Sequence, residues 1–228
     1  MKKSLYARYG KRMLDFAISS CALIVVSPVM LGTYILVKKK LGTPVFFRQE
    51  RPGLHGKIFK MYKFRTMTDA RDADGNLLPD AERRTEFGQM LRKTSLDELP
   101  ELINIWKGDM SLIGPRPLLV KYLPYYTPEE NIRHEVRPGL TGLAQVHGRN
   151  TCIWEERFRY DREYVEHLTF GMDCKIIWQT IKTVLEASDI VAPGVMEDFD
   201  DYRKKQRADA GVQTSVSRDG KCAVCKER

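Results

Sequence analysis

The sequence lacks the motifs that identify most soluble nucleotide-binding and metal-dependent enzymes. It has no phosphate-binding glycine loop of the P-loop or dinucleotide type, which argues against a P-loop or Rossmann enzyme. It also has no zinc-protease helix, and no Cys/His cluster with metal-ligand spacing occurs before its C-terminal tail. The chemistry of the chain must therefore reside in other patterns.

Cysteine is scarce and scattered along the chain. The five cysteines are an odd number without the spacing of a small secreted disulfide scaffold, so we expect a reducing, cytoplasmic setting for the body. The pair Cys222-x-x-Cys225 lies in a polar tail without a second pair, and we predict no zinc site there.

Long hydrophobic runs are limited to one, Phe16–Val37, which contains no charged residue. As one straight helix it would reach ~33 Å, enough to cross a ~30 Å hydrocarbon core. A polytopic transferase would need several such segments, so the sequence argues against that class. A cleaved signal peptide also fits poorly, because the run is longer than the ~7 to 15 residues of a signal-peptide core.

Both flanks of this hydrophobic segment are basic, with Lys11 and Arg12 before it and Lys38–Lys40 after it. The positive-inside tendency then places both ends on the cytoplasmic face, which a single crossing cannot satisfy. Pro28 lacks an N–H and frees a backbone carbonyl, and Ser27 can hydrogen-bond that region, so a bend is expected at Ser27-Pro28. We predict a broken, re-entrant helix; an ordinary kinked transmembrane helix or signal anchor stays open at this point.

A β-hairpin is predicted after the membrane segment. The short β-type runs Val45–Phe47 and Ile58–Tyr62 are separated by turn signals. Lys63 and Arg65 leave the second arm on one face, opposite Phe64, and could form a two-cation surface for phosphate. The alternative is an exposed basic strand edge that protects against edge pairing.

The rest of the body is predicted to be mainly helical. Residues 69–84 form a polar loop leading into a helix near 82–92, and two further helices occupy 154–187, divided at 169–171. The second carries an apolar stripe that suits either core packing or the lipid headgroup layer. Residues 199–228 are predicted to be a polar, disordered tail. The stripe consists of Ile177, Trp178, Ile181, Val184 and Leu185.

The adjacent acids Asp97 and Glu98 admit two interpretations. With Thr94 and Ser95 they fit helix capping boxes, which would make them structural. Adjacent helical residues point ~100° apart, so they cannot act as two facing carboxylates. They could instead divide two jobs at a helix start, one attacking phosphorus and the other holding a hard divalent cation.

Arg116 lies between two prolines in Gly114-Pro115-Arg116-Pro117, which confines its backbone and offers a planar fork for phosphate. Residues 102–106 supply an apolar face for the helix between the acids and Arg116, and Lys107-Gly108 should end that helix. The net charge of +8 favours anionic partners in general, which include nucleic acid, anionic lipid and nucleotides.

Six segments together resemble the bacterial sugar transferase family, the small monotopic phosphoglycosyl transferases. The resemblance covers about residues 8–190, and its set of motifs is highly specific. The segments are SPVMLG, GTPVFFRQERPG, YKFRTM, TSLDELPEL, GDMSLIGPRP and RPGLTGLAQVHGRN.

This resemblance implies transfer of a sugar 1-phosphate from a UDP-sugar to a polyprenyl (undecaprenyl) phosphate, with release of UMP, at the start of glycan assembly. By the resemblance, Asp97 is the nucleophile that forms a phosphosugar-aspartyl intermediate, and Glu98 helps to hold Mg²⁺. Lys63 and Arg116 belong to the phosphate-binding surroundings. The resemblance also implies a re-entrant anchor broken at Ser27 and Pro28.

Five further residues are candidates for binding the nucleotide or sugar. Arg137 begins a rigid turn, and Gln145 and Arg149 lie in what is predicted to be a polar loop; without the family it is only a glycine-rich surface loop. Asp161 and Asp173 match acidic positions of the family, and a structural salt bridge is an equal alternative for both. His147 in the same loop is not assigned to catalysis, because many relatives carry asparagine there.

The sequence as a whole predicts an α+β, mainly helical protein of the bacterial inner membrane. Its parts are a re-entrant anchor over 1–40, a compact catalytic domain on the cytoplasmic face over 41–198, and the tail over 199–228. The domain is expected to contain a small β-hairpin and interfacial amphipathic helices. Its partners are the UDP-sugar, polyprenyl phosphate and membrane lipid, with Mg²⁺ as cofactor and no nucleic acid. The rival hypothesis is a non-catalytic, membrane-anchored basic protein that binds nucleic acid or anionic lipid.

Overall fold

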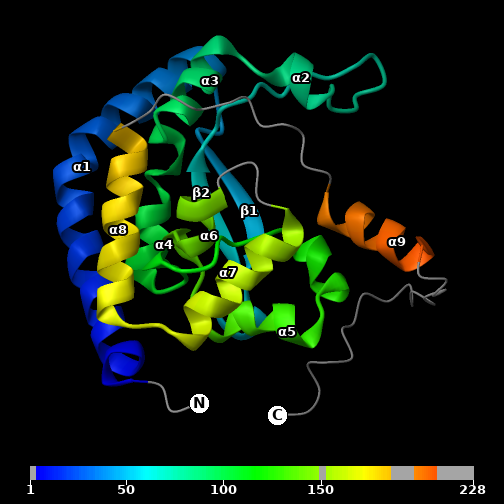
Figure 1. The fold of residues 1–228 in the computed structure, drawn as a ribbon. Coiled ribbons are helices and arrows are strands. Elements are labelled where there is room, and N and C mark those ends of the chain that lie inside the picture. The colour runs from blue at the N-terminus through cyan, green and yellow to red at the C-terminus, as the bar shows by residue number, and fades with distance from the viewer. Residues whose placement is uncertain (1–3, 149–152, 186–197, 210–228) are drawn as a thin grey trace.

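The computed structural model describes residues 4–148, 153–185 and 198–209. Within them, helices surround a long β-hairpin, and α1 lies along one side of the molecule (Figure 1). The helices are α1 Lys11–Leu41, α2 Asp80–Arg83, α3 Glu86–Lys93, α4 Glu101–Lys107, α5 Pro128–Asn131, α6 Leu143–Gly148, α7 Trp154–Glu166, α8 Phe170–Leu185 and α9 Phe199–Asp209. The strands are β1 Phe46–Pro52, β2 Ile58–Phe64, β3 Ser111–Ile113 and β4 Gly139–Thr141. The coarse prediction of a mainly helical α+β fold is confirmed.

Short irregular turns complete the described chain. A π-helical turn, Tyr6–Gly10, leads directly into α1. Four 3₁₀ turns lie farther along, at Leu54–Gly56, Leu96–Glu98, Val120–Tyr125 and Ile132–Glu135.

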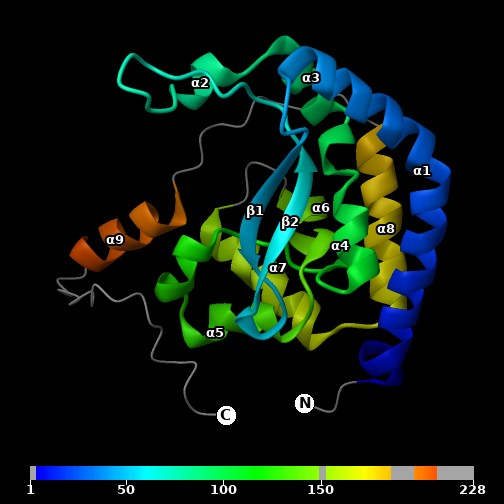
Figure 2. The same ribbon diagram turned by 180° about the vertical axis from the view of Figure 1, so that it is seen from behind.

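Strands β1 and β2 form the predicted antiparallel hairpin, seen from behind in Figure 2. Phe46 pairs with Phe64 at the open end, and Pro52 pairs with Ile58 near the turn. Phe64 is buried and its ring stacks on that of Phe46 at 5.3 Å between centroids. Because side chains alternate along a strand, burial of Phe64 turns Lys63 toward the opposite face.

Strands β3 and β4 form a second, parallel pair of only a few residues. Ser111 pairs with Gly139 and Ile113 with Thr141. This pairing places the segment that follows β3, Gly114–Pro117, directly against the glycine-rich turn around β4. Two of the sequence motifs, far apart along the chain, therefore meet at one place.

Helix α1 is continuous through Pro28 and curves along its length (Figure 1). Ser27 Oγ donates to the carbonyl of Ile24 at 2.8 Å, which is the carbonyl that proline leaves without its helical partner. The hydrogen bond predicted for Ser27 is therefore present, but the predicted break is not: α1 runs as one helix through Pro28, because Ser27 satisfies the carbonyl that the proline leaves free. In the described part of the chain, one helix, Tyr6–Leu41, is long and apolar enough to cross a membrane.

The N-terminal half of α1 is fixed to the body by polar contacts. Arg12 donates to the carbonyls of Ile105 and Trp106, at the end of α4, at 2.7 and 2.8 Å. The buried Asp15 accepts a hydrogen bond from the N–H of Leu112 in β3 at 3.0 Å. The anchor and the catalytic body are therefore joined by specific contacts in addition to the chain itself.

Helices α7 and α8 confirm the two helices predicted over 154–187. The helix predicted near 82–92 is divided instead, because Thr85 leaves the helical conformation and caps α3 by accepting from the N–H of Gly88 at 3.0 Å. The predicted stripe on α8 is not core: Trp178 is 69% exposed and Val184 64%. Of the two interpretations of this stripe, core packing is therefore wrong.

Two loop or tail predictions were wrong. Gln145 and His147 lie in helix α6, because Leu143 and Ala144 are buried against the body and hold this segment in a helical turn. Residues 199–209, predicted to be disordered, form α9, because Phe199 is fully buried. Two aromatic residues, Phe199 and Tyr202, in an otherwise charged segment were too weak a signal to predict this helix.

Candidate functional site

The acidic pair lies in a 3₁₀ turn, Leu96–Glu98, just before α4. Neither predicted capping box forms: the Ser95 side chain makes no cap hydrogen bond, and Thr94 Oγ1 donates back to Met90 and Leu91 of α3. Ser95 has a left-handed backbone, with φ of 54°, which turns the chain sharply between α3 and α4. The capping interpretation of Asp97 and Glu98 is therefore wrong, and their carboxylates are available for other contacts.

Glu98 is the centre of a cluster of charges from three segments. Its Oε1 accepts from Lys63 Nζ of β2 and from Arg116 Nη2 of the proline-flanked turn, both at 2.6 Å. Burial opposes ionisation, but the charges and hydrogen bonds of Arg116 and Lys63 outweigh it and lower the pKa of Glu98 to about 2. The carboxylate is thus a fixed anion that holds the Lys63 and Arg116 side chains in place.

Asp97 has a different environment from its neighbour. It is buried, and among the described residues no side chain forms a hydrogen bond with its carboxylate. Burial raises the pKa of Asp97 and the negative charge of Glu98 raises it further, while Lys63 and Arg92 oppose the rise. When the pKa values of two neighbouring acids are shifted in opposite directions, the two acids commonly have different chemical roles. Asp97 is the more basic carboxylate, and it lacks the contacts with Lys63 and Arg116 that hold Glu98.

Glu101 is a third acid of the cluster, which the sequence analysis did not identify. It lies at the first position of α4, is 2% exposed, and its Oε1 is 3.1 Å from Lys63 Nζ. Burial raises its pKa, Lys63 opposes the rise and Glu98 adds to it. Its spacing of three residues from Glu98 across a helix start was a signal that could have identified it.

The backbone of the turn around Arg116 is held by hydrogen bonds from three segments, β4, Arg133 and Arg51. Gly114 donates to Thr141 at 2.9 Å, and the N–H of Gly139 donates to the carbonyl of Pro115 at 3.0 Å. Arg133 Nη2 donates to the carbonyl of Arg116 at 2.6 Å, and Arg51 Nη1 to that of Pro117 at 3.3 Å. The prolines on either side and these bonds together direct the Arg116 side chain toward Glu98.

Gly114 is required in this turn because neighbouring backbone approaches it closely. A Cβ at this position would lie only 2.4 Å from the carbonyl oxygen of Arg137. The glycine therefore permits the contact between the two motifs that meet beside Arg116.

Arg51 and Arg133 are further cations near the turn that the sequence analysis did not select. Burial and the nearby charge of Arg116 lower the pKa of Arg51 to about 10. Arg133 is buried and forms an ion pair with Asp161 at 3.0 Å. Their sequence contexts are ordinary, so only the fold reveals their proximity to Arg116.

The predicted phosphate-binding residues do not all lie together. Lys63 and Arg116 meet at Glu98, whereas Arg65 forms an ion pair with Asp69 at 2.6 Å and donates to the carbonyl of Thr43 at 3.3 Å. Strand β2 ends at Phe64, so the alternation that would place Arg65 beside Lys63 does not continue. In the structure Arg65 connects the end of the anchor segment to the start of the polar loop.

The nucleotide or sugar candidates are dispersed. Arg137 Nε donates to the carbonyl of Gly108 at 2.8 Å, where it closes the end of α4. Gln145 lies in α6, and its buried amide atoms make no hydrogen bond within the described residues. Arg149 lies outside the described residues. Their roles toward a substrate stay predictions.

Asp161 and Asp173 are both buried in structural contacts. Asp161 pairs with Arg133, as described above. Asp173 Oδ2 accepts from Lys11 Nζ at 2.8 Å and from the Tyr6 hydroxyl at 2.5 Å, and Oδ1 accepts from the Tyr164 hydroxyl at 2.8 Å. These contacts match the salt-bridge alternative that the sequence left open for both residues.

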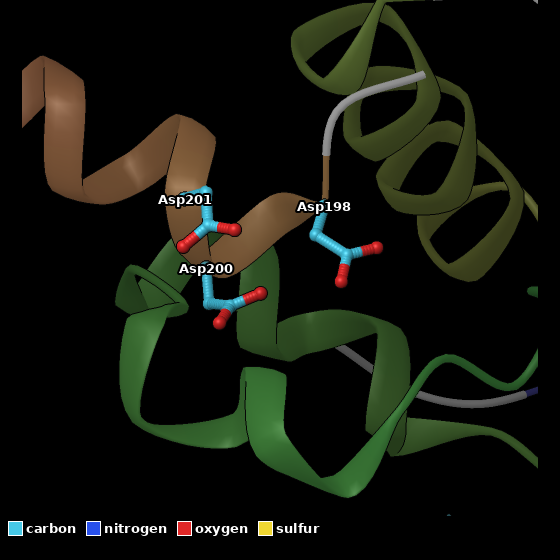
Figure 3. Close-up of side chains that lie close together, drawn as sticks. All are labelled: Asp198, Asp200 and Asp201. Atoms are coloured by element: carbon cyan, nitrogen blue, oxygen red, sulfur yellow. The ribbon is translucent and has the colours of Figure 1, made fainter. Parts of the chain in front are cut away.

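A cluster of three acids at the start of α9 could in principle bind a cation (Figure 3). Its members are Asp198, Asp200 and Asp201. Lys121 pairs with Asp198 and Asp200 at 2.5 and 3.0 Å, and Lys204 pairs with Asp201 at 2.7 Å. Lysines already neutralise these carboxylates, of which Asp198 and Asp201 are exposed, so the cluster is an ion-pair network.

For Mg²⁺, the adjacent carboxylates of Asp97 and Glu98 are the donor set that fits. Both offer hard oxygen ligands of the kind this ion prefers. Only Oε1 of Glu98 is engaged by Lys63 and Arg116, and the Asp97 carboxylate has no side-chain partner among the described residues.

A long apolar helix is fixed to a small α+β body in which Glu98 pairs with Lys63 and Arg116, and this combination is typical of a membrane-associated enzyme that acts on phosphate groups. The sequence model of the family described as "Bacterial sugar transferase" matches residues 6–187. The chain belongs to the bacterial sugar transferase family.

Several curated relatives support this assignment. The chain is 52% identical over 180 residues to "Uncharacterized sugar transferase EpsL" of Bacillus subtilis, covering 79% of this chain and 89% of the relative. It is 38% identical to an "Undecaprenyl-phosphate galactose phosphotransferase" of Salmonella typhimurium, covering 78% of this chain and 41% of the relative. It is 39% identical to a "UDP-glucose:undecaprenyl-phosphate glucose-1-phosphate transferase" of Klebsiella pneumoniae, covering 75% and 39%. The chain thus spans about two fifths of the length of the latter two proteins.

Replacing Asp173 with alanine should destabilise the protein by about 3 to 5 kcal/mol, because Lys11 would be left buried without its partner. Chemical denaturation measures the loss, with Glu166→Ala, an exposed residue of α7, as the matched control. An Asp173→Ala protein as stable as the control would contradict a structural role for this carboxylate.

Proposed function

We propose that this protein transfers a sugar 1-phosphate from a UDP-sugar to a polyprenyl phosphate, releasing UMP, as an initiating membrane step of bacterial glycoconjugate assembly. The observation that carries the proposal is the pair of adjacent acids in unlike environments: Asp97 has no side-chain hydrogen bond among the described residues, and Glu98 holds Lys63 and Arg116. The family and the names of its relatives, which include undecaprenyl-phosphate sugar phosphotransferases, support the same reaction class.

In the first step, Asp97 attacks the phosphorus atom that carries the sugar. The bond from this phosphorus to the bridging oxygen breaks, UMP leaves with the electron pair, and a phosphosugar-aspartyl ester forms. In the second step, an oxygen of polyprenyl phosphate attacks the same phosphorus and the Asp97 carboxylate leaves. Two displacements at one phosphorus return the enzyme to its starting state.

A diphosphate repels a carboxylate nucleophile, so positive charge must surround the reacting group. Lys63 and Arg116 supply it, and Glu98 holds both in position before substrate arrives. The Arg116 side chain is 41% exposed, which leaves its planar fork accessible to a phosphate. Glu101 provides a second anchor for Lys63.

Mg²⁺ is part of the proposal, with Glu98 as its main protein ligand. When bound, the ion would neutralise charge on the diphosphate and on the departing UMP. In the part of the chain that the structure describes, the second oxygen of Glu98 and the carboxylate of Asp97 are available to hold it.

The membrane anchor would bring the lipid substrate to the site. A polyprenyl chain cannot leave the membrane cheaply, since each exposed CH₂ costs ~0.8 kcal/mol, so the enzyme must act at the interface. We propose that α1 enters and leaves by the cytoplasmic leaflet of the inner membrane. Basic residues at both of its ends support this re-entrant topology, and Pro28, whose freed Ile24 carbonyl is bonded by Ser27, is a point at which the helix can bend.

A non-catalytic protein that binds nucleic acid or anionic lipid is disfavoured by the family assignment. The cations at the site are also paired with buried acids, an arrangement that a nonspecific basic surface does not need.

Asp97→Asn should lower UMP release from UDP-sugars by more than ~10³-fold and abolish trapping of radiolabelled phosphosugar on the protein, because the amide cannot form the ester. UMP release and protein-bound label are measured across a panel of UDP-sugars with Mg²⁺ and polyprenyl phosphate. Asp74→Asn, at an exposed loop position, is the control and should retain both. Substantial turnover by Asp97→Asn would contradict a covalent intermediate on Asp97.

Glu98→Gln should weaken metal binding by at least ~10-fold, because a charged oxygen ligand is lost. Titration with Mn²⁺ followed by electron paramagnetic resonance reports metal binding directly, and the Mg²⁺ dependence of UMP release reports its effect on turnover. Glu50→Gln, at an exposed position in β1, should leave both unchanged. A metal profile of Glu98→Gln equal to that of the parent would argue against a ligand role.

The re-entrant topology predicts that both ends of α1 lie on the same side of the membrane as the body. In a cysteine-free background, Leu5→Cys and Asp74→Cys should both react with a membrane-impermeant maleimide in inverted vesicles and not in intact cells. If Leu5→Cys reacted only in intact cells while Asp74→Cys reacted only in inverted vesicles, α1 would cross the membrane and the re-entrant proposal would be wrong.

A further inference from the structure

Helix α9 lies beyond the part of the chain that matches the family, residues 6–187, yet it packs onto the catalytic body. Phe199, its first residue, is fully buried in a cluster of hydrophobic side chains. The cluster contains Leu118, which follows the Arg116 turn by two residues, together with Tyr122, Trp154 and Phe158.

Phe199 makes close ring contacts with its aromatic neighbours. Its centroid lies 5.0 Å from that of Phe158 and 5.1 Å from that of Trp154, both on α7. It also stacks on Tyr126 at 5.4 Å. Offset and edge-to-face ring pairs of this kind contribute to stability beyond the apolar area that they bury.

Polar contacts hold α9 to three segments of the body. Asp198 lies at the start of the helix (Figure 3). It pairs with Lys121 at 2.5 Å. Arg203 pairs with Glu130 of α5, and the Tyr202 hydroxyl donates to Glu155 of α7. The helix therefore docks in a defined position.

The rings that contact Phe199 also enclose Arg133. The guanidinium of Arg133 lies 5.5 Å from the centroid of Phe158 and 5.8 Å from that of Tyr126. The Tyr126 hydroxyl accepts from Arg133 Nη1 at 3.2 Å. Phe199 thus packs against the two rings, Tyr126 and Phe158, that cover Arg133.

Arg133 connects this cluster to the site of phosphate chemistry. It pairs with the buried Asp161 at 3.0 Å and donates to the carbonyl of Arg116 at 2.6 Å. Hydrogen bonds in a water-excluded environment are stronger and better fixed than bonds exposed to solvent. Burial of Arg133 therefore stabilises the backbone of the residue whose side chain holds Glu98.

We propose that α9 is a positioning element for Arg116, with Phe199 as its key residue. Phe199 supports Tyr126 and Phe158, these rings bury Arg133 with Asp161, and Arg133 fixes the carbonyl of Arg116. The proposal rests on the proposed function in assigning Arg116 to the diphosphate. It gives the C-terminal helix a role in the reaction, although α9 contributes no group that touches the substrate.

The test compares Phe199→Ala and Phe199→Leu with the parent and with Asp201→Asn, an exposed residue of α9 whose ion pair among the described residues is with Lys204. Phe199→Ala should lower kcat for UMP release by about 10-fold and leave KM within about 2-fold, because misplacement of a charge-stabilising group affects the transition state most. Phe199→Leu, which keeps apolar burial, should show a smaller loss, and Asp201→Asn none. If Phe199→Ala does not fold, Phe199→Leu carries the comparison. A Phe199→Leu enzyme with the parent's kcat would overturn the proposal.

A double-mutant cycle with Arg116→Lys separates positioning from general stability. If α9 acts through Arg116, the loss caused by Phe199→Leu should largely disappear in the Arg116→Lys background. Fully additive effects would overturn the proposal, since a purely structural role affects both backgrounds alike.

Hydrogen exchange provides a readout that does not depend on activity. Phe199→Leu should accelerate exchange at least ~10-fold in the peptide covering 111–126, and Asp201→Asn should not. Unchanged exchange would contradict the proposed linkage. If Phe199→Leu accelerated exchange as expected but the parent released no UMP from any UDP-sugar, the proposed function would be refuted and the structural linkage would stand.

Discussion

Buried charges must be paired, and the arrangement of this protein depends on how that constraint is met. Removing an ion from water costs several kcal/mol unless an opposite charge and hydrogen bonds replace the lost solvation. Glu98 meets the requirement by accepting from Lys63 and Arg116. Each pair joins segments far apart in the sequence, so the pairing that satisfies the acid also assembles the site.

The same constraint connects the site to the membrane anchor. Lys11 of α1 pairs with the buried Asp173, and Arg12 satisfies the last carbonyls of α4. Because α4 is a short, rigid helix that begins at Glu101, its attachment to α1 also orients the acidic turn before it. The contacts of Lys11 and Arg12 thus help to set the position of Asp97 and Glu98 relative to α1.

Local patterns predicted a good part of the fold and of the site. The hairpin, the end of α4 at Gly108 and the division between α7 and α8 follow from turn residues and hydrophobic periodicity. The family resemblance selected Lys63, Arg116 and Glu98 as site residues, and the structure adds that both cations contact Glu98. Helix α9 could not be predicted this way, because its formation depends on an aromatic pocket built from residues 118–158.

The sequence by itself determined the membrane segment, the family and the identity of the acids and cations, because these depend on composition and on motifs that are local in the chain. The tertiary structure decided which of them act together. It brought Lys63 to Glu98 but directed Arg65 to Asp69, added Glu101 and Arg133, and assigned Asp161 and Asp173 to buried ion pairs. Which charged residues pair with each other depends on long-range proximity and on burial, and neither can be read from the linear sequence.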